Sequence, residues 1–261
     1  MSSYLSVATR ANALRWSIAI LAILGGMLVS GSGRADSAAR AEPLRVLFIG
    51  NSQTSTNDLP AFVAAMARKS KHAAVEYRTI APSAVTLENH WKTGTPIPAL
   101  TGQQWDAVVM QQGPSVLPGG RARLCHYARL FADEARARGA RPYLLMVWPR
   151  DHSPVEQVID SYAAAAAASG STLIPAGAAW GAAWRRKPEL ALHAWDGIHP
   201  SGLGTYLAAL VVYAGLRGAL PAAPTSLVVS GKLFWITRGT ARLLRESAAE
   251  ALATRFPASA C

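Results

Sequence analysis

Short apolar runs alternate with longer amphipathic stretches along the chain from residue 44 onward. Most of the apolar runs are continuous rather than alternating with polar residues, which is typical of strands buried on both faces in a parallel sheet. Five runs are predicted as strands: Leu44–Ile49, Val75–Ile80, Asp106–Met110, Pro142–Trp148 and Thr172–Pro175.

The stretches between and after these runs have helical character. Gly139 stands where a helix would stop, and the run of alanines at Ala163–Ala168 favours a helix. The predicted helices are Asp58–Ser70, Gly120–Gly139, Pro154–Ser169, Ser201–Leu216 and Thr240–Thr254. The pattern leaves Pro221–Ile236 unassigned.

Strands that alternate with long helices predict a three-layer, flavodoxin-like α/β fold around a central parallel sheet of about five strands. No internal repeat and no linker interrupts this pattern. We therefore expect residues 42–261 to form a single domain.

The first 41 residues have the order of a secretory signal. Arg10 and Arg15 precede an uncharged segment at residues 16–33, and small residues follow it. This order predicts export with cleavage after Ala35 or Ala41, giving a periplasmic or secreted protein. An uncleaved membrane anchor formed by residues 16–33 is the alternative, although its central apolar segment is short for a membrane span.

Composition and charge narrow the function classes. The chain is 51% hydrophobic and 16% charged, which excludes a disordered protein. Its net charge is +11, and removal of residues 1–35 leaves +8. The basic residues are scattered and do not interleave with aromatic side chains, so we expect no nucleic-acid partner. We expect instead a solvated basic surface with weak affinity for an anionic envelope surface.

Two cysteines, Cys125 and Cys261, are too few for a disulfide-dense scaffold or a multi-cysteine zinc module. They would pair only in an oxidising compartment. The sequence leaves open whether they do, because Cys261 is the terminal residue and chain ends are often poorly ordered.

The first candidate for chemistry follows the first predicted strand. In open α/β sheets, ligands bind outside the carboxyl ends of the strands. Gly50 ends this strand, and Ser52 then stands where the next helix begins. A serine there can present its hydroxyl beside the unpaired N–H groups of the helix end, which suit an oxyanion. The alternative is that Ser52 merely caps the helix.

The second candidate is Asp196, three residues before His199 on a loop that opens a late helix. A carboxylate in this place can hold one imidazole nitrogen and leave the other as a general base. A histidine with a purely structural bond is one alternative. A metal site is another, but one Asp and one His are too few ligands.

Taken together, the two motifs resemble the SGNH hydrolases, also called GDSL-type esterases and lipases. The resemblance covers Leu44 to Leu216, and Asn51 stands where the family commonly has Asp. It implies a serine ester hydrolase in which Ser52 attacks the ester, His199 is the base and Asp196 orients it. No metal or organic cofactor is implied.

The resemblance also implies an oxyanion hole, although the middle of the chain matches the family less well. The backbone N–H of Ser52 and one near Ala84 are the first two candidate donors, with Ala84 standing where the family usually has Gly. The family's third donor is an Asn side chain. Gln112 or Ser115 falls in its place here, and the Gln112 amide is the chemically nearer substitute.

Substrate-binding candidates are Asn51, His90 and Trp195, which lie near the expected site. For His90, the alternative is a surface histidine beside a packed tryptophan. Arg150 and His152 follow the fourth strand, where they would contact substrate or belong to an ordinary polar loop.

The function predicted is hydrolysis of carboxylic esters of small acyl groups on a small molecule or a glycan, with acetylated carbohydrate as the substrate chosen by analogy. An O-acyltransferase that passes the acyl group to a glycan would use the same three residues. A non-catalytic carbohydrate-binding envelope protein on a hydrolase scaffold is the candidate from another class.

Overall fold

The computed structural model describes residues 42–70, 73–150 and 153–261. The predicted signal or anchor segment and His152 lie outside the described residues. No helix within the described residues combines the length and hydropathy that a bilayer crossing requires.

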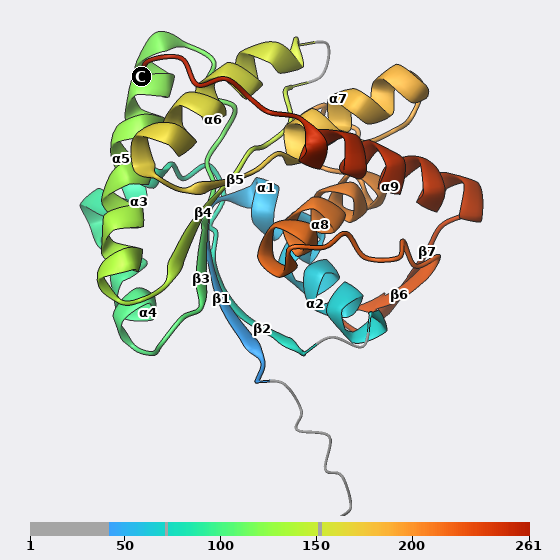
Figure 1. Ribbon diagram of the computed structural model, residues 1–261, viewed down its shortest axis with the longest axis horizontal. Helices are drawn as coiled ribbons and strands as arrows, with labels where there is room; N and C mark the ends of the chain where they lie inside the picture. The colour runs from blue at the N-terminus through green and yellow to red at the C-terminus, as the bar shows by residue number, and fades with distance from the viewer. Residues whose placement is uncertain (1–41, 71–72, 151–152) are drawn as a thin grey trace, which may run out of the picture. The chain divides into compact units, whose positions relative to one another are not determined.

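The described residues form a five-stranded sheet in the order β2-β1-β3-β4-β5, with every neighbouring pair parallel (Figure 1). The strands are β1 Leu44–Ile49, β2 Val75–Ile80, β3 Ala107–Met110, β4 Arg141–Leu145 and β5 Thr172–Ile174. This confirms the predicted flavodoxin-like α/β fold. The chain leaves β1 for β2 on one side and then returns to β3 on the other. The carboxyl ends of β1 and β3 therefore border the switch point where such sheets bind ligands.

Helices cover both faces of the sheet, with α5 and α6 on one face and α2 and α8 on the other (Figure 1). The helices α7 and α9 pack against each other and against α8. The bounds are α1 Ser52–Ser55, the 3-10 turn η1 Thr56–Asp58, α2 Leu59–Lys69, α3 Leu87–Thr93, α4 Ile97–Thr101, α5 Pro118–Ala137, α6 Val155–Ser169, α7 Ala176–Arg186, α8 Gly202–Arg217 and α9 Arg238–Ala253.

The segment that the pattern left unassigned forms an antiparallel hairpin of β6 Ser226–Val229 and β7 Lys232–Trp235. Ser230 and Gly231 make its turn with φ angles of 47° and 78°. Positive φ at both central residues is what a two-residue type I′ turn requires. The α7 helix was also not predicted, although its alanine-rich sequence favours a helix.

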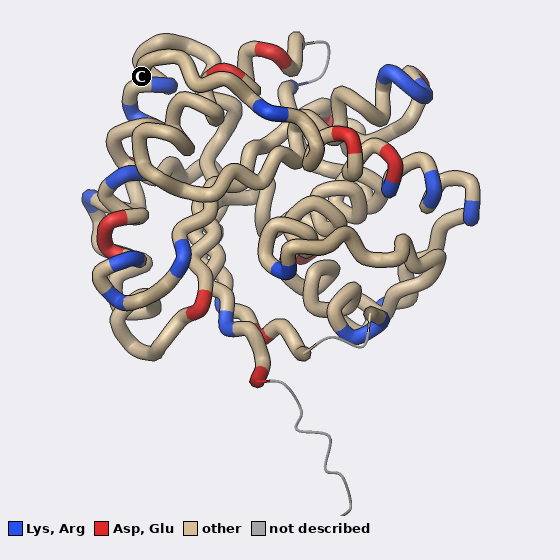
Figure 2. Tube along the Cα trace, in the orientation of Figure 1, with Lys and Arg blue, Asp and Glu red and all other residues tan. Residues whose placement is uncertain are grey.

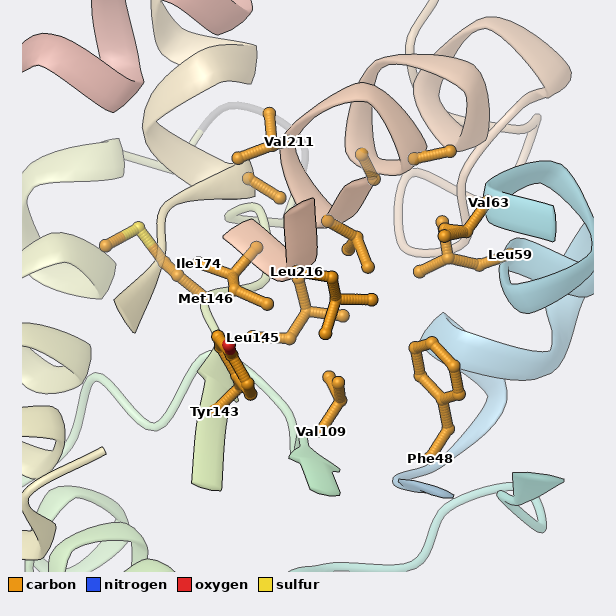
Figure 3. Close-up of a cluster of buried hydrophobic side chains, with 14 of the residues drawn as sticks. Phe48, Leu59, Val63, Val109, Tyr143, Leu145, Met146, Ile174, Val211 and Leu216 are labelled. Carbon is orange, nitrogen blue, oxygen red and sulfur yellow. The ribbon is translucent and has the colours of Figure 1, made fainter. Parts of the chain in front are cut away.

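Side chains of the sheet and of two helices make up the core. Figure 3 shows apolar side chains from β1, β3, β4 and β5 meeting those of α2 and α8, among them Phe48, Leu59, Val63, Val109, Leu145, Ile174, Val211 and Leu216. Burial of each such side chain stabilises the fold by roughly 1.5–3 kcal/mol. One cluster of buried residues extends from β1 to α9, so a chain without its first 41 residues keeps the whole described core.

Candidate active site

A glycine and a buried glutamine shape the loop that presents Ser52. Gln111, just after β3, accepts bonds at Oε1 from the Asn51 N–H and the Thr54 hydroxyl, both at 2.9 Å. A Cβ on Gly50 would lie 2.5 Å from that oxygen and 2.8 Å from the Thr54 hydroxyl oxygen, so a larger residue there would displace the two side chains that hold the loop. Asn51 caps α1 by accepting the Gln53 N–H at 3.0 Å. The loop therefore holds Ser52 as the first residue of α1.

The loop before α8 brings Asp196 and His199 to Ser52. Asp196 Oδ1 accepts the N–H groups of Ile198 and His199 at 3.0 and 2.9 Å. Its Oδ2 lies 2.6 Å from His199 Nδ1, and His199 Nε2 lies 2.9 Å from Ser52 Oγ. Residues 147 positions apart in the sequence thus form one continuous hydrogen-bonded chain.

The charge on Asp196 is stabilised by its own loop. The hydrogen bond from the His199 ring, then the backbone N–H of His199 and that of Ile198, hold the pKa of Asp196 well below its usual range. The carboxylate is therefore ionised at neutral pH. A negative partner at Nδ1 keeps the proton on that nitrogen, which leaves Nε2 with a lone pair toward the serine hydroxyl.

Two further side chains fasten the histidine loop to the body of the protein. Trp148 donates its indole N–H to the Ile198 carbonyl at 3.0 Å and stacks on Trp180 with ring centroids 4.3 Å apart. On the other side, Asn57 Nδ2 donates to the Pro200 carbonyl at 2.8 Å. The loop is thus held on both sides of His199.

Ser52 and His199 open into a cleft of about 310 Å³. Small and polar side chains dominate its walls. Among the described residues that line the cleft, Arg150 is the only charged one apart from His199. The lining residues are Asn51, Ser52, Gln53, Ser83, Ala84, Gly113, Pro114, Arg150, Ile198 and His199.

The predicted oxyanion donors fall into two groups. Ser52 and Ala84 line the cleft, and Ala84 has a φ of 59°, a left-handed conformation that favours glycine. Gln112 and Ser115 do not line it. The Gln112 amide accepts the Leu87 N–H at 3.1 Å and donates to the Ser115 hydroxyl at 2.8 Å, and that hydroxyl donates to the Gly113 carbonyl. Both side chains brace the cleft wall instead of facing the cleft.

Of the three predicted substrate-binding residues, only Asn51 lines the cleft. The Asn51 amide already has partners within the protein: it donates to the Val85 carbonyl at 3.1 Å and also bonds to Gln53 and Gln111. The interpretation of His90 as a cleft residue or a surface histidine is corrected, because it is 1% exposed and its Nε2 lies 2.7 Å from the Gly50 carbonyl. Burial lowers the pKa of His90, so this ring is a neutral support beneath the serine loop.

Trp195 is 98% exposed and is not among the described cleft residues. Its position next to Asp196 puts it beside the site rather than within it.

Sequence reasoning missed Gln111 and Asn57. Successive residues of an extended chain point to opposite sides, so Gln111 turns toward the serine loop and its neighbour Gln112 toward the other side. The available signal was the position of Gln111 directly after β3, at the same sheet edge as Ser52. Within the described ranges, no three His, Cys, Asp or Glu side chains group as ligands of a metal ion would.

Comparisons with known proteins agree with this fold. No protein-family profile and no curated protein matches the chain. Among solved structures, a candidate SGNH hydrolase from Slackia heliotrinireducens is 26% identical with a TM-score of 0.58, over 67% of this chain and 100% of that one. A DUF4886 family protein from Bacteroides uniformis is 17% identical with a TM-score of 0.64, over 84% and 98%.

A third solved structure is a catalytic mutant of an acetylxylan esterase from Geobacillus stearothermophilus. It is 15% identical with a TM-score of 0.55, over 68% of this chain and 96% of that one. At such identity the likeness concerns the fold alone. The sheet order, the helical layers and these structural neighbours show that the chain has the fold of the SGNH hydrolases, which fits the resemblance to a divergent member of that superfamily.

Proposed function

We propose that this chain is an esterase that cleaves carboxylic esters of small acyl groups through an acyl-enzyme on Ser52. The observation that carries the proposal is the hydrogen-bonded chain from Ser52 to His199 to Asp196, with distances of 2.9 and 2.6 Å, at the floor of a cleft. The fold of the SGNH esterases is consistent with this chemistry.

The geometry supports acyl transfer in two halves. His199 Nε2 takes the hydroxyl proton as Ser52 Oγ attacks the ester carbonyl, and it then gives that proton to the departing alcohol. In the second half, His199 activates a water that releases the acid from Ser52. Asp196 keeps the ring oriented and stabilises the imidazolium that forms in both halves.

Two backbone N–H groups are proposed to bind the oxyanion. Ser52 is the first residue of α1, and the first N–H groups of a helix have no partner within the helix. Ala84 lines the cleft in a left-handed conformation, at the position where the resemblance expects glycine. That strained conformation is consistent with an N–H aimed at a developing charge.

The walls of the cleft support a small acyl group on a polar alcohol. Ser83, Ala84, Gly113 and Pro114 leave room for a group such as acetyl, and the described residues that line the cleft form no long apolar channel. Arg150 offers several N–H donors to sugar hydroxyls or to an anionic group. By analogy with the Geobacillus acetylxylan esterase, we propose acetylated carbohydrate as the substrate class.

We also propose export. The N-terminal segment has the order of a secretory signal. In addition, Cys125 and Cys261 form a disulfide between α5 and the chain end, and such bonds persist in oxidising compartments.

The first test is hydrolysis of p-nitrophenyl acetate by the purified chain without residues 1–41. We expect Ser52→Ala and His199→Ala to lower kcat by about a thousandfold or more, since loss of a triad member commonly has that effect. Ser83→Ala is the matched control, because this serine lines the same cleft without a described contact to His199. It should leave kcat within a few-fold of wild type.

The second arm uses acetylated xylo-oligosaccharide with and without an acceptor sugar. Released acetate supports the esterase, and acetylated acceptor would redirect the assignment to a transferase with the same residues. Unchanged activity in Ser52→Ala overturns the proposed nucleophile. A folded wild-type chain inactive on both esters overturns the proposed esterase.

A further inference from the structure

The β6–β7 hairpin has an unusually apolar outer face. Strand pairing sets Val228 opposite Leu233, and Trp235 lies two residues further along the same face. These three side chains are 57%, 69% and 68% exposed, and they are three of the seven large apolar side chains that the described residues expose. We call them the hairpin face. Apolar exposure concentrated in this way marks an interaction surface.

Nothing in the packing of the hairpin requires its outer face to be apolar. The inner face carries Leu227, which is buried, and Phe234, whose ring lies 5.0 Å from that of Phe62. Arg68 Nη2 donates to the Val228 carbonyl at 3.2 Å and so ties β6 to α2. Polar outer residues would leave these contacts intact, because antiparallel strands commonly carry polar side chains on the solvent face.

Basic residues flank the hairpin. Lys232 precedes Leu233 on β7 and, by strand alternation, lies on the opposite face of the hairpin, where it pairs with Val229; Arg68 contacts the β6 backbone. Arg238 opens α9 three residues after Trp235. Figure 2 shows Lys and Arg positions near β6 and β7.

Nearby acidic groups have partners within the protein. Asp58 accepts bonds from the Ser230 hydroxyl, at 2.7 Å, and from the Ala61 N–H. Glu246 on α9 lies 3.8 Å from Arg242. Asp58 keeps its negative charge because these donors are neutral, but Arg68, Lys232 and Arg238 outnumber it around the hairpin.

We propose that the hairpin face docks this protein on the surface of an anionic lipid bilayer. A Trp, a Leu and a Val on one rigid face provide the apolar contact, and Trp favours the boundary between headgroups and acyl chains. Arg68, Lys232 and Arg238 supply the attraction to lipid phosphates, which adds to apolar insertion in peripheral proteins. This combination of aliphatic side chains and positive charge favours lipid over a nucleic acid or a flat protein partner.

The hairpin also connects to the candidate active site. Phe234 packs so closely on Gly202 that a Cβ there would lie 3.0 Å from its ring. Gly202 begins α8 three residues after His199. Docking through the hairpin face would therefore hold the loop of His199 close to the lipid-bound element. The docking proposal itself does not depend on esterase activity.

The test is co-sedimentation of the chain without residues 1–41 with vesicles of phosphatidylcholine alone or with roughly 30% phosphatidylglycerol, an anionic lipid. We expect wild type to bind the anionic vesicles and to release them as salt is raised. The double variant Leu233→Ser, Trp235→Ser should bind about tenfold more weakly or worse, and Lys232→Gln with Arg238→Gln several-fold more weakly.

Leu117→Ser is the matched control, because Leu117 is 73% exposed at the start of a different helix, α5. It should bind the anionic vesicles as wild type does. Circular dichroism and p-nitrophenyl acetate hydrolysis show whether each variant folds. If the wild-type chain is folded but does not hydrolyse the ester, the vesicle-binding result still tests the docking proposal. Absence of wild-type binding, or equal loss in Leu117→Ser, overturns the proposal. So does a concentration-dependent dimer that the hairpin variant abolishes, since the occupant is then a second copy.

Discussion

Asn57 joins the segment that follows Ser52 to the loop of His199. Its Nδ2 donates to the Pro200 carbonyl at 2.8 Å and to the Thr205 hydroxyl at 3.0 Å. Its φ of 58° is left-handed, a conformation that Asn tolerates better than most residues. Held in this way, Asn57 sets the distance between the segments that carry the serine and the histidine.

We expect Asn57→Ala to lower kcat for p-nitrophenyl acetate by roughly ten- to a hundredfold with little change in KM, because small misplacement of reacting groups slows the chemical step. Asn57→Asp should behave similarly, since the carboxylate cannot donate to the Pro200 carbonyl. Steady-state kinetics and urea unfolding on the same preparations separate positioning from stability.

Asn89→Ala serves as the control, because Asn89 caps α3 through Thr86 and has no described contact with the histidine loop. It should lose stability but keep kcat. A loss of kcat no larger in Asn57→Ala than in Asn89→Ala would reject the positioning role.

The close approach of helices and loops around α8 depends on glycine. A Cβ on Gly204, in the first turn of α8, would lie 2.2 Å from the Leu192 carbonyl oxygen and 2.4 Å from the Trp180 ring. Gly177 at the start of α7 is equally confined, with the Val147 carbonyl oxygen 1.9 Å from a Cβ. Backbone on one side of each contact leaves no flexible group to move aside.

Gly204→Ala should lower the free energy of unfolding by about 3 kcal/mol or more, since overpacking against fixed backbone is strongly destabilising. Gly239→Ala on α9 is the matched control, because the nearest atom to its Cβ would be 3.9 Å away. It should be neutral or stabilising by up to about 1 kcal/mol, from helix propensity. Urea unfolding followed by circular dichroism measures both, and a Gly204→Ala as stable as wild type would contradict the packing argument.

The elements themselves were largely predictable. Apolar runs predicted all five strands of the sheet. Local sequence patterns also predicted the helices α2, α5, α6, α8 and α9, with boundaries that differ from the observed ones by a few residues. Some observed boundaries differ from the predicted ones because local geometry ends or starts the element. Pro142–Trp148 ends its pairing at Leu145, and the last helix starts at Arg238 because Thr237 caps it. The hairpin was not predicted, because its signal lies in a two-residue turn within a Pro-rich segment.

The disulfide between Cys125 and Cys261 spans 136 positions and joins α5 to the end of the chain. Figure 1 shows the last residues running from α9 across to the α5 side of the sheet. The Arg121 guanidinium donates to the Ala260 carbonyl at 2.7 Å in the same region. A link between such distant positions restricts the unfolded chain far more than it restricts the folded one.

Cys261→Ser should lower the free energy of unfolding by about 2–4 kcal/mol, the usual range for a native disulfide. The measurement is urea unfolding with and without dithiothreitol. Reductant should bring wild type down to the variant and leave the variant unchanged. Equal stability of oxidised and reduced wild type would show that the bond does not hold the fold together.

Hydrophobic patterning alone was enough for the α/β class, the parallel sheet and the sheet edge at which Ser52 would stand, because strand burial and helix periodicity are properties of neighbouring residues. Asp196 and His199 were joined to Ser52 only by their motif and by the family resemblance. The identity of the groups around that site was not accessible in this way. Whether Gln111 or Gln112 braces the serine, whether His90 is buried, and whether Ala84 adopts a positive φ all depend on which chain segments pack against each other. Those contacts join residues tens to more than a hundred positions apart, and only folding brings them within hydrogen-bonding distance.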